Sequence, residues 1–298
     1  MNIWQELLSI FSSGLEFGLL NCLMVLGLMI ALRFASFPDL TIEGALPIGA
    51  AICAVSTLSG IPPLLSIFLG GLAGSLAGSV TASLHLLTGM SRLLAGIIMM
   101  TALYAISLRV MQGSNVPLFD VTTWYSEVNG WDGRCLRTIV LVLPITVLLT
   151  VFFHTEFGLL LRASAENWNL VKKLGKPCWL YLLVTLAISN GLVGLSGALL
   201  TQSNRFADVG FGSGSIITSL AALLLGETIL IPTSVGRQII AAILGSFLYS
   251  SIFSLALSLG LHPWDLKLVS ACFVLLAILI SKRFSGGMET RRIGCDPL

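Results

Sequence analysis

The polar residues best able to do chemistry in this chain lie close together near its N-terminus. Asp39, Thr41 and Glu43 place two carboxylates and a hydroxyl group within five residues, beside long apolar runs. Carboxylates in such surroundings are costly unless they face water or partner groups. We favour a turn between two helices that faces water; the alternative is irregular backbone that lines a polar cavity. Asn21 and Asn190 are further candidates for such a cavity, although hydrogen bonding between helices is the role we favour for each.

The histidines and cysteines form no pattern typical of catalysis or metal binding. His85, His154 and His262 lie far apart in the sequence, and none of the six cysteines belongs to a Cys-x-x-Cys pair. The Gly175-Lys176 pair is followed by proline, so it does not belong to a phosphate-binding loop. The sequence therefore predicts no metal site, no enzymatic activity and no ability to hydrolyse ATP.

The composition of the 298 residues indicates a membrane protein. Hydrophobic residues make up 56% of the chain and charged residues 10%, whereas an ordinary soluble domain has about 25% charged residues. So few charges cannot cover a soluble fold of this size, which excludes an ordinary soluble enzyme and a disordered chain. The formal net charge of +2 is too small for a surface that binds nucleic acid.

Charged residues divide the chain into apolar runs whose lengths predict membrane spans. A span needs about 20 apolar residues, and the runs predict eight or nine spans. They are residues 16–33, two spans within 44–91 that are separated at 60–63, and about 92–111, 137–154, 177–200, 215–231, 237–260 and 264–282. The expected fold is therefore an all-α, polytopic transmembrane helix bundle, with residues 1–298 forming a single domain.

The basic residues predict the orientation of the chain in the membrane, because cytoplasmic loops carry an excess of Lys and Arg. With the tail, residues 282–298, in the cytoplasm, most of the 16 basic residues fall on the cytoplasmic side. These are positions 33, 92, 162, 172, 173, 176, 237, 282, 283, 291 and 292. The loop at about 156–177 is then cytoplasmic, and the segment at about 112–137 is extracytoplasmic.

A stripe of glycines in the third predicted span indicates close helix packing. Gly70, Gly74 and Gly78 are spaced by four residues, so they share one helix face. Small residues let two backbones approach in a membrane, where the hydrophobic effect does not drive helix association. We favour packing within one subunit, with a seam between two subunits as the alternative.

The cytoplasmic loop has the features of a docking helix. Residues 158–175 predict a short helix that ends at a glycine and has lysines in its last turn. Leu170, Val171 and Leu174 share an apolar face, and Arg162 and Glu166 are spaced to pair across one turn. A solvated connector between spans would explain the charges and the glycine. It explains the apolar face less well, so we favour a helix that binds a partner protein.

The same loop resembles the coupling loop of bacterial ABC importer permeases of the branched-chain amino acid and ribose type. The matching positions are Arg162-Ala163, Glu166 and Leu174-Gly175, and Lys176-Pro177 departs from the family pattern. Three more blocks resemble this family in the same order, namely residues 33–44, 93–104 and 189–200. The blocks at 33–44 and 93–104 resemble the subgroup that works with an extracytoplasmic binding protein for amino-acid-like ligands.

This resemblance implies partners and roles for the residues. The chain would be the permease subunit of an importer in the bacterial inner membrane, as a homodimer. ABC ATPase subunits, which hold the ATP and Mg²⁺, would bind the coupling loop, and this chain would need no cofactor. The residues implied in coupling are Arg162, Ala163, Glu166, Leu170, Leu174 and Gly175. The candidates for the translocation path are Asn21, Asp39, Thr41, Glu43 and Asn190.

A self-sufficient secondary transporter of small solutes is the alternative function. It would need ionisable residues within the spans for ion coupling. Glu227 and Asp265 are at span ends and Arg109 is near one, so the spans contain almost none. We therefore expect transport that is driven by a separate ATPase.

Overall fold

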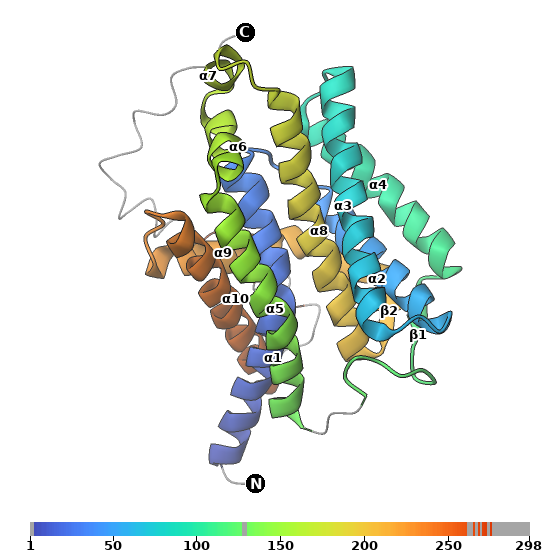
Figure 1. The fold of residues 1–298 in the computed structure, drawn as a ribbon. Coiled ribbons are helices and arrows are strands. Elements are labelled where there is room, and N and C mark those ends of the chain that lie inside the picture. Colours follow the sequence, from blue (N-terminus) through green and yellow to red (C-terminus); the bar gives the residue numbers. More distant parts are fainter. Residues whose placement is uncertain are drawn as a thin grey trace.

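The computed structural model describes residues 3–126 and 130–260, together with 265, 268, 270–272 and 275, and this part is a bundle of helices (Figure 1). The α-helices are α1 (Ile3–Met29), α2 (Ile42–Leu58), α3 (Pro63–Thr88), α4 (Arg92–Met111), α5 (Trp131–His154), α6 (Glu156–Glu166), α7 (Trp168–Lys173), α8 (Cys178–Asn204), α9 (Ser215–Ile229) and α10 (Val235–Ser258). A π-helical turn, η1 (Ile30–Phe34), extends α1, and a 3-10 turn, η2 (Val209–Gly212), precedes α9. The strands β1 (Asn115–Pro117) and β2 (Phe206–Asp208) are short.

The helical bundle confirms the expected fold class, while the count of eight or nine spans is not confirmed. Six helices in the described residues are long and apolar enough to cross a membrane: Ser12–Phe34, α3, α4, Asp132–His154, α8 and α10. The second and seventh predicted spans are the shorter helices α2 and α9, with 17 and 15 residues. At about 1.5 Å per residue, α2 is about 25 Å long, less than the roughly 30 Å of a bilayer core. The ninth predicted span and the tail at 282–298 lie outside the described residues.

Helices α1 and α8 form the centre of the bundle. Figure 1 shows α8 between α3 and α5, and α8 also packs against α1 and α2. Hydrogen bonds join the two central helices: Ser196 donates to the Leu20 carbonyl at 2.7 Å, and Ser189 donates to the Gly27 carbonyl at 2.7 Å. Because both hydroxyls are buried, these bonds satisfy polar groups that would otherwise be costly inside a membrane protein.

The outer helices α4 and α5 expose large apolar side chains. On α5 these include Leu136, Val140, Leu143, Leu148 and Val151. A soluble protein would rarely expose such a continuous apolar surface, whereas a membrane-spanning helix presents it to lipid.

The two ends of the bundle carry different structures. At one end, β1 and β2 pair antiparallel with Asn115 opposite Asp208, so the segment after α4 lies beside the end of α8 (Figure 1). Nearby, Tyr125 hydrogen-bonds Thr138, and burial raises the pKa of this tyrosine to about 12. The opposite end carries α6 and α7, and Arg92 there donates to the Ser36 carbonyl at 2.6 Å. Segment 112–137 and loop 156–177 therefore lie at opposite ends, as the predicted topology requires.

Candidate functional site

The polar residues at 39–41 form a buried cluster instead of a solvated turn. Asp39 is only 2% exposed and Thr41 is fully buried. Asp39 Oδ1 accepts from the Thr41 backbone N–H at 2.8 Å, and Asp39 Oδ2 accepts from Asn190 Nδ2 at 2.6 Å. The Thr41 hydroxyl bonds that of Thr81 at 2.9 Å. The favoured prediction of a turn that faces water was wrong, because the Asn190 amide and the Thr41 backbone N–H satisfy the Asp39 carboxylate in place of water.

This cluster braces the irregular backbone between η1 and α2. Asp39 and Asn190 connect the start of α2 to the middle of α8, while Thr41 and Thr81 connect it to α3. Irregular backbone at membrane depth is tolerated only where protein surrounds it. Asp39, Thr41 and Asn190 are therefore together in space, but none of them lines the large cavity described below.

Glu43 lies apart from that cluster, in the first turn of α2. Its Oε1 atom accepts a hydrogen bond from the Gly214 N–H at 3.2 Å, immediately before α9 begins. Glu43 therefore ties the start of α2 to the start of α9, two short helices that are far apart in the sequence.

A cavity of about 340 Å³ lies between α1, α9 and α10, and it is the candidate solute site. Of the five sequence candidates, Asn21 is the one among its described lining residues. The lining also includes Leu46, Leu200, Asn204, Phe211 and parts of α9 and α10. No Asp, Glu, Lys, Arg or His is among the described residues that line it. Solute recognition there must rely on apolar contact, hydroxyl and amide groups, and backbone dipoles.

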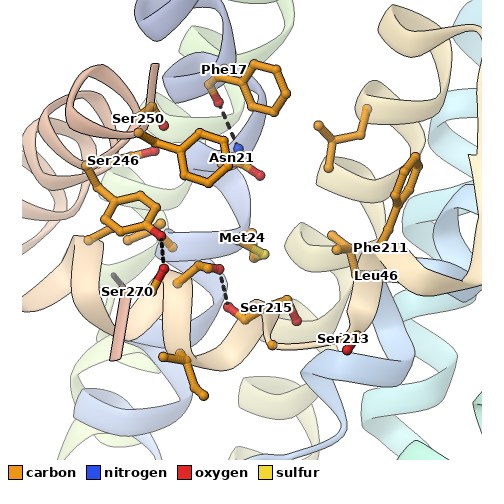
Figure 2. Close-up of a pocket in the computed structure, with 18 of the residues that line it drawn as sticks. Phe17, Asn21, Met24, Leu46, Phe211, Ser213, Ser215, Ser246, Ser250 and Ser270 are labelled. Atoms are coloured by element: carbon orange, nitrogen blue, oxygen red, sulfur yellow. Dashed lines mark hydrogen bonds between the residues drawn. The ribbon is translucent and has the colours of Figure 1, made fainter. Parts of the chain in front are cut away.

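Aromatic rings and hydroxyl groups both line the cavity, and Figure 2 shows Ser246 and Ser250 on the same side as Phe17, with Ser213 and Ser215 on the other. Phe17 and Tyr249 each lie near Phe253, with ring centroids 6.4 Å and 6.3 Å apart. Hydroxyl groups come from the first turn of α9 and from α10: Ser213, Ser215, Thr218, Ser246 and Ser250. Sequence reasoning missed these residues. The small-residue run 212–215 and the serines four residues apart on α10 were the available signals.

The predicted docking helix is two helices instead of one. The chain bends at Asn167, whose φ of −146° and ψ of 86° are not helical, so α6 ends and α7 begins there. Gly175 has a φ of +70°, and its N–H bonds the Lys172 carbonyl, so it does end α7 as expected. The lysines occupy the last turn of α7.

The side chains of this loop are arranged differently from the sequence prediction. Arg162 donates to the Phe153 carbonyl at 3.4 Å, and it forms no ion pair with Glu166 in the part of the chain that the structure describes. Val171 is buried, whereas Leu174 is 60% exposed, so they do not share one exposed face. Ala163 is half-buried and Glu166 is exposed. The side chain of Leu170 lies outside the described part.

The glycine stripe of α3 lies against α8 within this chain. A Cβ at Gly74 would meet the Asn190 carbonyl oxygen, and one at Gly78 would meet the Leu186 carbonyl oxygen. A Cβ at Gly70 would approach Ala198 and the Gly49 carbonyl. The α3 backbone thus lies directly on the α8 backbone, which is the intrasubunit packing that we favoured.

The described residues include six apolar helices that are long enough to cross a membrane, with a cavity inside the bundle, and these features define a multi-pass membrane protein. Residues 10–279 match the family described as branched-chain amino acid transport system, permease component. The chain belongs to this family of ABC importer permeases, whose members are multi-pass proteins of the inner membrane.

Several relatives of this chain are permease proteins of transport systems. A tyrosine transport system permease protein of Clostridioides difficile is 35% identical over 88% of this chain and 87% of its own length. A probable branched-chain amino acid transport permease protein of Methanocaldococcus jannaschii is 24% identical over 95% of this chain and 94% of its own length. A ribose import permease protein of Bacillus subtilis is 24% identical over 83% of this chain and 77% of its own length. No solved structure matches the chain significantly.

Proposed function

We propose that this chain is the permease subunit of an importer for an amino-acid-like solute, which a binding protein delivers and separate ATPase subunits drive. Two copies of the chain form the pathway. The observation that carries the proposal is the cavity between α1, α9 and α10, which is large enough for a small organic solute and is lined by aromatic rings and hydroxyl groups. The similarity to a tyrosine transport permease supports the solute class.

ATP-driven transport fits this cavity better than ion-coupled secondary transport. A secondary transporter binds its coupling ion through ionisable or carbonyl groups beside the solute. The described lining residues include no carboxylate, and the nearby carboxylates accept hydrogen bonds from the protein: Asp39 from Thr41 and Asn190, and Glu43 from the Gly214 N–H. ATP and Mg²⁺ are then held by the partner subunits.

Helices α6 and α7 are the proposed contact with the ATPase, with Arg162, Ala163, Glu166, Leu170, Leu174 and Gly175 as the coupling residues. Two features support this role: Trp168 and Leu174 expose 40% and 60% of their surface, and Glu166 is exposed beside them. Such apolar groups at a membrane-protein end are typical of a binding surface. Arg162 and Val171 anchor the pair of helices to the bundle.

The five proposed path residues have different parts in this scheme. Asn21 contacts the solute, because it lines the cavity. Glu43 positions the start of α9, which forms one wall of the cavity. Asp39, Thr41 and Asn190 hold the start of α2 against α8 and α3.

The test is uptake by cells that co-express the chain with its ATPase and binding protein. Glu166→Ala and Gly175→Val should abolish uptake and weaken co-purification of the ATPase, while the chain still inserts at normal abundance. Valine at Gly175 must adopt a φ of +70°, which costs about 1 kcal/mol or more. Glu156→Gln, an exposed residue at the other end of α6, is the control and should transport normally.

Asp39→Ala separates the two parts of the proposal, because it should impair uptake while the ATPase stays bound. Normal transport by both Glu166→Ala and Gly175→Val, with the ATPase attached, would show that α6 and α7 are only a connector. ATP hydrolysis by the purified chain alone would contradict the assignment to a permease subunit.

A further inference from the structure

We propose that the first turn of α9, with Ser215, is a carboxylate-binding subsite for a zwitterionic amino acid whose apolar side chain lies against the aromatic residues of α1 and α10. This inference rests on the proposed function and deepens it by assigning a chemical role to each side of the cavity.

The start of α9 lines the cavity. Ser213, Gly214 and Thr218 line the cavity together with Ser215 (Figure 2). The first N–H groups of a helix have no carbonyl partner within the helix. They carry the positive end of the helix dipole, so this turn favours a negatively charged group. A carboxylate therefore finds both donors and a favourable field there, without a cationic side chain.

Ser215 is the independent sign of a ligand at this turn. The residue is 4% exposed, and its hydroxyl oxygen has no hydrogen-bond partner in the part of the chain that the structure describes. Buried hydroxyls normally have a partner, because an unsatisfied polar group loses its hydration without compensation. A carboxylate oxygen in the cavity would accept this O–H and restore the missing bond.

Glu43 shows both the affinity of this turn for a carboxylate and a limit on the ligand. Its Oε1 atom already accepts the Gly214 N–H at 3.2 Å. A ligand that brings only a carboxylate would add a second negative charge near Glu43. Like charges repel more strongly in a low-dielectric site than in water. A zwitterion adds no net charge, so an amino acid is favoured over a simple carboxylic acid.

The other side of the cavity determines which amino acids fit. Phe17 and Phe253 lie close together, and Tyr249 extends the same aromatic surface. Figure 2 shows Phe17 and the α10 residues on one side of the cavity and Ser213 and Ser215 on the other. Aromatic side chains prefer apolar or aromatic contacts. The ligand therefore has an apolar side chain at one end and its carboxylate at the other.

The experiment measures binding of radiolabelled L-phenylalanine to the full chain in lipid nanodiscs. Two competitors measure the contribution of each charged group of the ligand: phenethylamine lacks the carboxylate, and 3-phenylpropionate lacks the ammonium group. We expect L-phenylalanine to compete best, 3-phenylpropionate to compete at least about ten-fold more weakly, and phenethylamine to compete least.

Ser215→Ala should weaken L-phenylalanine binding about ten-fold, since a hydrogen bond to a charged group is lost. It should leave the weak binding of phenethylamine unchanged, because that probe has no carboxylate. The matched control is Ser219→Ala, one turn further along α9. The Ser219 hydroxyl donates to the Ser215 carbonyl at 2.6 Å within the helix, so its loss should change binding less than two-fold.

Three results would overturn the subsite. In the first, Ser215→Ala binds L-phenylalanine as tightly as the unmodified chain does. In the second, phenethylamine competes as well as L-phenylalanine. In the third, L-phenylalanine does not bind to the unmodified chain. A failure of this subsite can be distinguished from a failure of the proposed importer function. If cells still show ATPase-dependent uptake of another solute class while L-phenylalanine does not bind, the importer assignment holds and the carboxylate subsite is rejected.

Discussion

The α3–α8 contact and the region between α1, α9 and α10 both use small residues, with opposite results. Glycines on α3 let its backbone lie on the carbonyl oxygens of α8, and no space remains for a side-chain atom. Around the cavity the small residues are mainly serines, aromatic rings are also part of the lining, and about 340 Å³ remains open. Glycine removes volume from a contact, whereas serine keeps a polar group at its edge.

This difference separates a densely packed part, the contact of the α3 glycine stripe with α8, from a part that can receive a solute, the region between α1, α9 and α10. Helix α9 combines both kinds of packing. Its first turn lines the cavity, while a Cβ at Gly226, near its other end, would meet the Ala241 carbonyl of α10. A short helix that is held firmly at one end and borders a cavity at the other is suited to respond to a ligand. The comparison leads to three predictions.

The largest effect is expected from filling the cavity. Ser250 lines it and is 4% exposed, so Ser250→Phe should place a ring where the solute binds and abolish uptake. The open volume accepts the ring, so the abundance and melting temperature of the chain should stay close to normal. Ser258→Phe, the same change at an exposed position of α10, should transport normally. Uptake by Ser250→Phe at the unmodified rate would show that this cavity is not on the solute path.

A smaller effect is expected from adding one methyl group in the dense part. Gly74→Ala places a Cβ against the Asn190 carbonyl, and overpacking of this kind typically costs about 1–3 kcal/mol. Gly236→Ala makes the same change in α10, where no atom lies within 4 Å of the added Cβ. It should be neutral or stabilise the helix by up to about 1 kcal/mol. Thermal unfolding in detergent measures both, and equal melting temperatures would refute the contrast.

The smallest effect is expected at the edge of the cavity-containing part. Glu16 pairs with Arg134 at 3.5 Å and accepts from Ser203 at 3.1 Å. Partly exposed ion pairs contribute about 0–1 kcal/mol, so Glu16→Gln should lower stability by less than about 1 kcal/mol and leave uptake intact. A loss of stability as large as that of Gly74→Ala would show that this ion pair, and not backbone packing, holds α1 in place.

The helices themselves were largely predictable from the sequence. Apolar runs fixed the approximate bounds of α3, α4, α5, α8 and α10, because a span in lipid must be apolar over most of its length. The four-residue spacing of Gly70, Gly74 and Gly78 predicted close packing, since residues so spaced share one face of a helix. The bounds of α2 and α9 were also close to the predicted runs, because residues 60–63 and Pro232 end these runs soon after the helices end.

The candidate site was much less predictable. Sequence reasoning selected polar residues such as Asp39 for a cavity or for water, yet Asp39 binds Asn190, which is 151 residues away. It also predicted one helix across Asn167, where the chain bends. The first error arose because a residue distant in the sequence satisfies the carboxylate, which no local pattern reveals.

The sequence by itself therefore determined that this is an all-α membrane protein, that the segment after α4 and loop 156–177 lie at opposite ends, and its family resemblance. These properties depend on composition and local spacing. Only the tertiary structure decided where the cavity lies and which groups face it. Phe17, Ser215 and Tyr249 meet there from three helices, and no local pattern marks residues whose proximity results from the packing of the whole bundle.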